Sequence, residues 1–154
     1  MATLYFHIPF CKRICTYCDF YKVGAIELIP RVVEMMHHEL EQRASYLSDR
    51  HLTSIYFGGG TPSYFGAENL DNILDEIHRN FHVSIDPEIT VEANPDSLDE
   101  KTLKRLLKAG FNRLSMGVQS HNDEVLQQLG RPHTFQQAKE AMELARKVGF
   151  CAVV

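Results

Sequence analysis

The feature that most restricts the fold is a regular alternation of short apolar runs with longer helical stripes. Runs rich in β-branched and aromatic residues occur at residues 4–8, 54–57, 89–93, 113–118 and 150–154. Strands that alternate with helices at this spacing are parallel and joined by right-handed crossovers. The pattern therefore predicts an α/β fold, either an open doubly wound sheet or part of a (βα) barrel.

The segments between the runs carry apolar residues at helical spacing. We predict helices at residues 27–46, 70–81, 97–109, 123–129 and 134–148. Ser97 with Glu100, and Thr134 with Gln137, have the spacing of capping boxes, and Gly110 follows the third helix at the position that favours glycine. No internal repeat or linker-like run interrupts residues 1–154, which we expect to form one continuous unit.

The composition excludes several classes of protein. With 44% hydrophobic and 23% charged residues the chain has ordinary globular composition, and a net charge of −4 gives no broad basic field for binding nucleic acid. No apolar run reaches the roughly 20 residues of a membrane span, and the N-terminus has no signal-peptide pattern. We expect a cytoplasmic protein, truncated because the sequence stops inside the last apolar run.

Three of the four cysteines lie close together directly after the first run. Cys11, Cys15 and Cys18 are separated by three and two residues, which lets one loop surround a compact metal site at the carboxyl edge of the sheet. Thiolates suit iron–sulfur clusters and zinc, and three ligands leave one iron of a [4Fe–4S] cubane without a protein ligand. An iron of that kind can bind a substrate, which favours chemistry over a purely structural site.

Two other interpretations fit the cysteine spacing alone. One is a structural zinc held by the three cysteines and His7, since three cysteines with one histidine form a common zinc shell. The other is thiols without metal, although an odd number of clustered thiols would leave one unpaired in a reducing compartment. Cys151 stands apart in the last run, and we expect it to be a small buried hydrophobic residue.

The segment from Tyr5 to Cys18, Y-F-H-I-P-F-C-x3-C-x-Y-C, resembles the radical S-adenosylmethionine (SAM) group that contains oxygen-independent coproporphyrinogen III oxidase and its haem-chaperone relatives. The resemblance continues through GGGTP at 58–62, EANP at 92–95, SMGVQ at 115–119 and LGR at 129–131. It implies a partial (βα)₆ barrel, truncated here after about four βα units, so that residues 1–154 are the N-terminal part of the radical SAM core. It also implies a [4Fe–4S] cluster on Cys11, Cys15 and Cys18, and SAM that is cleaved to a 5′-deoxyadenosyl radical.

The resemblance assigns SAM contacts by position. They are Tyr5, Tyr17, Gly59, Gly60, Thr61, Glu92, Gln119 and Arg131. The residue types suit these roles, because glycines let the backbone approach a ligand closely and arginine grips carboxylates through its fork of donors. The resemblance also places His7 near the cluster, and it assigns no catalytic residue.

One local difference separates the two branches of this group. The oxidases carry an extra cysteine two residues after the third ligand, where this chain has Asp19-Phe20. That difference favours the haem-chaperone branch over decarboxylation of coproporphyrinogen III to protoporphyrinogen IX in porphyrin biosynthesis. The expected partners are SAM, haem or a porphyrinogen, and an electron donor such as a flavodoxin or ferredoxin, and the motifs for haem would lie beyond Val154.

Overall fold

The computed structural model describes residues 2–154 and places its strands in one five-stranded sheet in sequence order. The strands are β1 (Ala2–Ile8), β2 (His51–Gly59), β3 (His82–Ala93), β4 (Arg113–Met116) and β5 (Ala152–Val153), and every neighbouring pair is parallel. A doubly wound sheet reverses its strand order, whereas this sheet never does. The fold is therefore part of a (βα) barrel, which resolves the choice that the sequence pattern left open.

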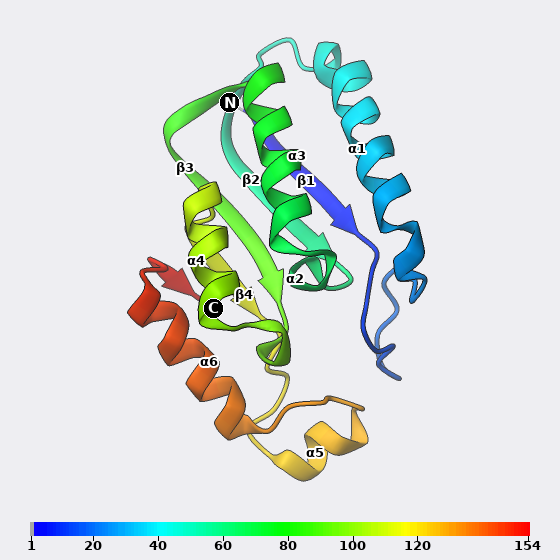
Figure 1. The fold of residues 1–154 in the computed structure, drawn as a ribbon, viewed down its shortest axis with the longest axis vertical. Coiled ribbons are helices and arrows are strands. Elements are labelled where there is room, and N and C mark those ends of the chain that lie inside the picture. Colours follow the sequence, from blue (N-terminus) through cyan, green and yellow to red (C-terminus); the bar gives the residue numbers. More distant parts are fainter. Residues whose placement is uncertain (1) are drawn as a thin grey trace.

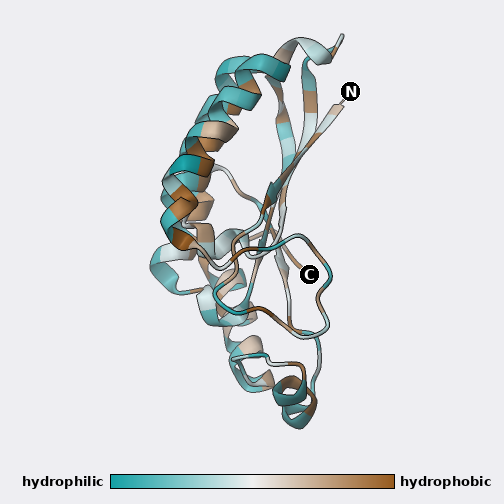
Figure 2. Cartoon of the chain, turned by 90° about the vertical axis from the view of Figure 1, so that its right-hand side faces the viewer, coloured by the Kyte–Doolittle hydropathy of each residue, from teal (hydrophilic) through white to brown (hydrophobic). Residues whose placement is uncertain are grey.

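The longer helices lie on one side of this sheet (Figures 1 and 2). The α-helices are α1 (Ile29–Arg43), α2 (Pro62–Phe65), α3 (Ala67–Asn80), α4 (Glu100–Ala109), α5 (Asp123–Gln128) and α6 (Phe135–Val148), and the 3₁₀ turns are η1 (Ile26–Leu28), η2 (Ala44–Tyr46) and η3 (Pro95–Ser97). Helix α5 lies beyond the carboxyl ends of the strands, away from the layer formed by α1, α3, α4 and α6 (Figure 1). Among the described residues, no helix has the length and apolar content needed to cross a bilayer.

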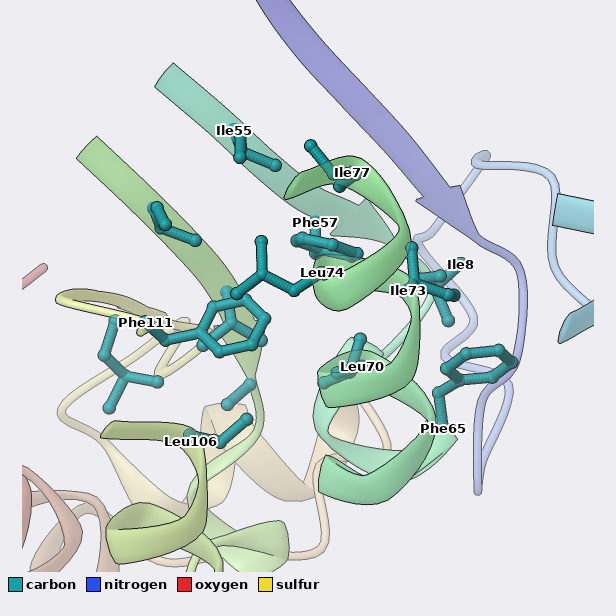
Figure 3. Close-up of a cluster of buried hydrophobic side chains, with 14 of the residues drawn as sticks. Ile8, Ile55, Phe57, Phe65, Leu70, Ile73, Leu74, Ile77, Leu106 and Phe111 are labelled. Carbon is teal, nitrogen blue, oxygen red and sulfur yellow. The ribbon is translucent and has the colours of Figure 1, made fainter. Parts of the chain in front are cut away.

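The core fills the space between the sheet and the helices that cover it. Figure 3 shows side chains of α3, among them Leu70, Ile73 and Ile77, packed against apolar residues of the strands. Phe57 of β2 contacts Phe111 edge-on, with 5.3 Å between the ring centroids. Burial of these large side chains supplies the main stabilisation of the layer.

The opposite face of the sheet carries polar side chains. Successive residues of a strand point to opposite faces, so these polar residues alternate with the core residues along each strand. Tyr5 of β1 lies beside Tyr56 of β2 in the parallel register, and Glu92 of β3 lies beside Ser115 of β4. In a (βα) barrel this face lines the interior. The polar side chains therefore gather where a barrel would enclose its ligand.

The helix ends confirm one predicted capping box and correct the other. Thr134 and Gln137 exchange both hydrogen bonds of a capping box at the start of α6. Helix α4 begins later than predicted, with Asp99 as its N-cap, and the Ser97 hydroxyl instead donates to the Asn94 carbonyl at 2.6 Å. Ser97 is drawn into this turn because Pro95 opens η3 immediately after β3.

Cys151 also differs from its prediction. It is exposed, whereas the sequence pattern placed it in a buried strand. Strand β5 spans only Ala152–Val153, so Cys151 lies in the bend that joins α6 to β5.

Candidate cluster and SAM site

The cysteine-bearing loop begins at the carboxyl end of β1 and is held by backbone hydrogen bonds on both sides. The Cys11 N–H donates to the Val23 carbonyl at 3.1 Å, and the Val23 N–H donates to the Pro9 carbonyl at 2.7 Å. On the other side, the Thr61 N–H donates to the Phe10 carbonyl at 2.8 Å. These bonds fix the base of the loop against the end of β2, which places Cys11 in the interior while Cys15 and Cys18 are partly exposed.

The loop and the ends of β2, β3 and β4 enclose a cavity of about 330 Å³. Its lining includes most of the residues singled out by the sequence, namely Cys11, Cys15, Tyr17, Cys18, Gly59, Gly60, Thr61, Glu92, Gln119 and Arg131. Tyr5 is the exception, because it lines a different groove next to α1. The structure therefore gathers the three thiols and seven of the eight predicted SAM contacts at one site.

The glycine segment at the end of β2 is held by the carboxylate of Glu92. The Gly59 N–H donates to Glu92 Oε2 at 3.1 Å, and the Tyr56 hydroxyl donates to Glu92 Oε1 at 2.7 Å. Burial raises the pKa of Tyr56 and the hydrogen bond to Glu92 raises it further, so this phenol remains a donor at neutral pH. Gly59 has φ +109°, and a Cβ there would lie 2.6 Å from the His7 ring, so glycine is required at this position.

Two of the three thiols receive hydrogen bonds from buried polar side chains. The Thr61 hydroxyl donates to Cys11 Sγ at 3.7 Å, and Arg131 Nη1 donates to Cys15 Sγ at 3.6 Å. Burial raises the pKa of the Cys11 thiol, the Thr61 hydrogen bond lowers it in part, and the neighbouring Cys18 and Cys15 raise it. The three thiols are thus close enough to influence one another, and two are met by donors that favour a thiolate acceptor.

Arg131 is almost fully buried at the floor of this site. Its Nη2 donates to Asn94 Oδ1 at 2.7 Å and to the Gly117 carbonyl at 2.5 Å, while Nε is buried without a hydrogen-bond partner among the described residues. The predicted grip on a SAM carboxylate would have to be made by this guanidinium, whose two terminal nitrogens already bond protein atoms. The arginine links the cysteine loop to the ends of β3 and β4.

The segment that carries Gln119 is held in an unusual backbone conformation. Gln119 has φ +74°, the only positive φ of a non-glycine residue among those described. His133 Nε2 lies 3.1 Å from the Val118 carbonyl, and this carbonyl can only accept, so Nε2 carries the proton. The side chains of Arg131 and His133 therefore hold two consecutive carbonyls, Gly117 and Val118, next to Gln119.

His7 does not face the cysteines as a metal ligand would. Its Nε2 lies 2.8 Å from the Tyr21 carbonyl and its Nδ1 lies 3.2 Å from the Tyr5 hydroxyl, so both ring nitrogens have protein partners. Within residues 2–154, no three side chains of His, Cys, Asp or Glu are close enough to share one metal ion. The structural-zinc alternative requires four ligands about 2.0–2.3 Å from one ion, which this arrangement does not provide.

Comparison with known proteins decides the family. The family model of the radical SAM superfamily matches residues 5–154. The chain belongs to the radical SAM superfamily. Its sheet, its cysteine loop and its site at the carboxyl ends of the strands are those of a partial radical SAM barrel.

Within the superfamily the chain is similar to two kinds of protein. It is 39% identical over 153 residues to Heme chaperone HemW of Haemophilus influenzae, covering 96% of this chain and 40% of that protein. It is 33% identical over 150 residues to Oxygen-independent coproporphyrinogen III oxidase of Salmonella typhimurium, covering 96% of this chain and 33% of that protein. The chain thus spans well under half the length of these relatives.

Among solved structures, coproporphyrinogen III oxidase (HemN) from Escherichia coli superposes with a TM-score of 0.90 at 31% identity, over 98% of this chain and 35% of that one. This agreement confirms the family resemblance that the motifs indicated. Radical SAM membership implies a [4Fe–4S] cluster and SAM. The donor set fits such a cluster, because a cubane distributes its thiolates over separate irons and does not require them to share one ion.

Sequence reasoning missed two residues of this site. Asn94 was noticed only as part of the EANP motif, yet it lines the cavity and bonds both Thr61 and Arg131. His133 had no role in the sequence analysis, yet it is buried and bonds the backbone at the end of β4. The proximity of His133 to Arg131 in the sequence was the one available signal.

Proposed function

We propose that this chain forms the cluster-binding and SAM-binding part of a radical SAM protein of the haem-chaperone type. Cys11, Cys15 and Cys18 would each bind one iron of the cluster, and the fourth iron would bind SAM. When bound, the cluster supplies the electron for reductive cleavage of SAM. The observation that carries this proposal is the convergence of three thiols with two directed donors at one cavity.

The side chains around the cavity would position SAM. Gly59 and Gly60 line the cavity, where the His7 ring and the Ile8 and Phe10 carbonyls leave no room for a Cβ, and Glu92 fixes the segment through the Gly59 N–H. Tyr17 lies at the cavity rim, where burial raises its pKa and keeps the phenol protonated. Gln119 and Arg131 line the same cavity and would supply donors to SAM, and Tyr5 would reach SAM only from outside this cavity.

Two observations support the haem-chaperone type. Phe20 is an exposed aromatic residue at the position where the oxidases have a cysteine. The similarity to a protein named Heme chaperone HemW, at 39% identity, exceeds the 33% identity to the oxidase named above. The oxidase activity is the second candidate, favoured by the TM-score of 0.90 with coproporphyrinogen III oxidase.

The two candidates are separated by assays on one anaerobically reconstituted preparation of the protein, expressed at the full length that its gene encodes. Titration with haem, followed by Soret absorbance, should give saturable binding for the chaperone type. Incubation with SAM, a reductant and coproporphyrinogen III should give no protoporphyrinogen IX by chromatography. Product formation without saturable haem binding would reverse the assignment. Transfer of haem and reduction of the cluster by an electron donor such as a flavodoxin or ferredoxin are further parts of the same proposal.

A further inference from the structure

We infer that Asn94 is a positioning residue that sets the direction of the hydrogen bonds reaching two of the cluster thiolates. This inference rests on the proposed function, since it concerns the cluster on Cys11, Cys15 and Cys18. Asn94 lies one residue beyond β3 and contacts both Thr61 and Arg131. A continuous chain of hydrogen bonds therefore runs from Cys11 through Thr61, Asn94 and Arg131 to Cys15.

The direction of this chain follows from the donor inventory of its members. A guanidinium can only donate, so the atom of Asn94 that faces Arg131 Nη2 at 2.7 Å must be the carbonyl oxygen Oδ1. The amide nitrogen Nδ2 is thereby turned toward Thr61 Oγ1, at 3.3 Å, and it can only donate. The Thr61 hydroxyl has one proton, which then points to Cys11 Sγ at 3.7 Å.

The surroundings hold Asn94 in this orientation. Its backbone carbonyl accepts from the Ser97 hydroxyl at 2.6 Å, and Ser97 Oγ lies 2.6 Å from Ser63 Oγ. Arg131 is further fixed by the Gly117 carbonyl, and its burial leaves it no water-exposed alternative. The amide is therefore locked on both sides, and Arg131 controls which of its ends meets Thr61.

Donors directed at cluster sulfurs change the reduction potential. A hydrogen bond stabilises the more negative reduced cluster more than the oxidised one, so each donor shifts the potential to a more positive value. Cys15 receives its donor directly from Arg131, whereas Cys11 receives its donor only while Asn94 keeps the Thr61 proton pointing inward. Asn94 thereby influences the hydrogen bonds to both Cys11 and Cys15 without contacting either sulfur.

The decisive variant is Asn94→Asp, which keeps the shape of the side chain and still accepts from Arg131. A carboxylate cannot donate, so the Thr61 hydroxyl turns to the new acceptor and Cys11 loses its hydrogen bond. Thr61→Val removes the same hydrogen bond directly, and Thr61→Ser retains it. Asn72→Asp, at an exposed position on α3, is the matched control for added negative charge.

The experiment is an EPR-monitored redox titration of the reconstituted protein and its variants, with iron content and circular dichroism for each. Both Asn94→Asp and Thr61→Val should shift the midpoint potential to more negative values, and Thr61→Ser and Asn72→Asp should leave it near that of the wild type. When Thr61→Val is already present, Asn94→Asp should shift the midpoint potential less, because only its added negative charge still contributes. If Asn94→Asp does not fold, Asn94→Ala takes its place with the same smaller effect expected in the Thr61→Val background.

The inference would be overturned if the shifts in midpoint potential caused by Asn94→Asp and Thr61→Val simply added in the double variant, or if Thr61→Val had the potential of the wild type. Either result would leave the proposed function intact. A wild-type protein that takes up no iron would overturn the proposed function and the inference together. Iron content and EPR of the wild type thus separate the two failures. Resonance Raman spectra in D₂O give a second readout. The shift of the iron–thiolate bands should be smaller in Thr61→Val than in the wild type, because this variant keeps only the Arg131 donor to Cys15.

Discussion

The Glu92 carboxylate joins two strands to the glycine segment, accepting from the Tyr56 hydroxyl at 2.7 Å and from the Gly59 N–H at 3.1 Å. Tyr56 lies on β2 and Glu92 on β3, so the interaction crosses the sheet at the mouth of the cavity. Because the Gly59 N–H donates to this side chain, the conformation of the segment depends on Glu92.

Replacement of Glu92 by glutamine should weaken SAM binding. The amide offers a single acceptor oxygen, so either the Tyr56 hydroxyl or the Gly59 N–H loses its acceptor, at a cost of about 1–3 kcal/mol for a buried donor. We expect the dissociation constant for SAM to rise by about tenfold, as 1.4 kcal/mol corresponds to one decade. Equilibrium dialysis of the reconstituted protein measures it, with the exposed Glu88→Gln as control. Unchanged affinity would show that Glu92 does not organise the SAM site.

Gly59→Ala should destabilise the fold itself. Alanine would adopt φ +109° only with strain, and its Cβ would lie 2.6 Å from the His7 ring. Strain of this kind costs on the order of 1–3 kcal/mol. Urea unfolding of the metal-free protein should show a loss in this range, whereas Gly24→Ala, which meets no atom within 4 Å, should change stability little. Equal stability of the two variants would contradict the requirement for glycine at position 59.

His133 should lower the free energy of unfolding as the pH falls into the mildly acidic range. Burial lowers its pKa, the hydrogen bond to Val118 opposes that shift, and the charge of Arg131 lowers the pKa further. The unfolded chain binds the proton near the ordinary imidazole value of about 6.5, so stability is full above that pH and declines as the pH falls toward the lower folded pKa. His133→Gln keeps a donor for Val118 and removes the titration. Urea midpoints from pH 7.5 to 5.5 should fall more steeply for the wild type than for this variant, and parallel curves would refute the assignment.

Cys15→Ser should abolish most iron binding, whereas Cys151→Ser should not. Cys15 lines the cavity and receives Arg131, while Cys151 lies exposed in the bend before β5. After reconstitution we expect about four iron atoms per chain in Cys151→Ser, as in a [4Fe–4S] protein. Colorimetric iron and sulfide assays give the comparison. Equal iron content in both variants would exclude Cys15 as a ligand.

The sequence predicted the parts of this structure that local chemistry determines. The Thr134–Gln137 capping box formed as predicted because both of its hydrogen bonds lie within one turn. The capping box at Ser97 was wrong because its hydroxyl is taken by Asn94 and Ser63, and Ser63 is far away in the sequence. The cysteine spacing predicted a shared site, and the family motifs predicted which strand ends would meet there.

The features that could not be predicted depend on contacts between residues far apart in the sequence. Asn94 became visible only when β2, β3 and the 129–131 segment were brought together, because its two side-chain partners are 33 and 37 residues away. Tyr5 was placed near SAM by its position in the motif, yet on β1 it packs beside Tyr56, with 6.0 Å between the ring centroids, outside the cavity. Its predicted contact with SAM remains a prediction.

The most direct test of the central claim is EPR of the anaerobically reconstituted, dithionite-reduced protein with and without SAM. We predict a reduced-cubane signal whose g values and line shape change when SAM is added, because the fourth iron is free to bind it. An EPR-silent protein that carries stoichiometric zinc, or a cubane signal that SAM leaves unchanged, would contradict a SAM-binding cluster on Cys11, Cys15 and Cys18.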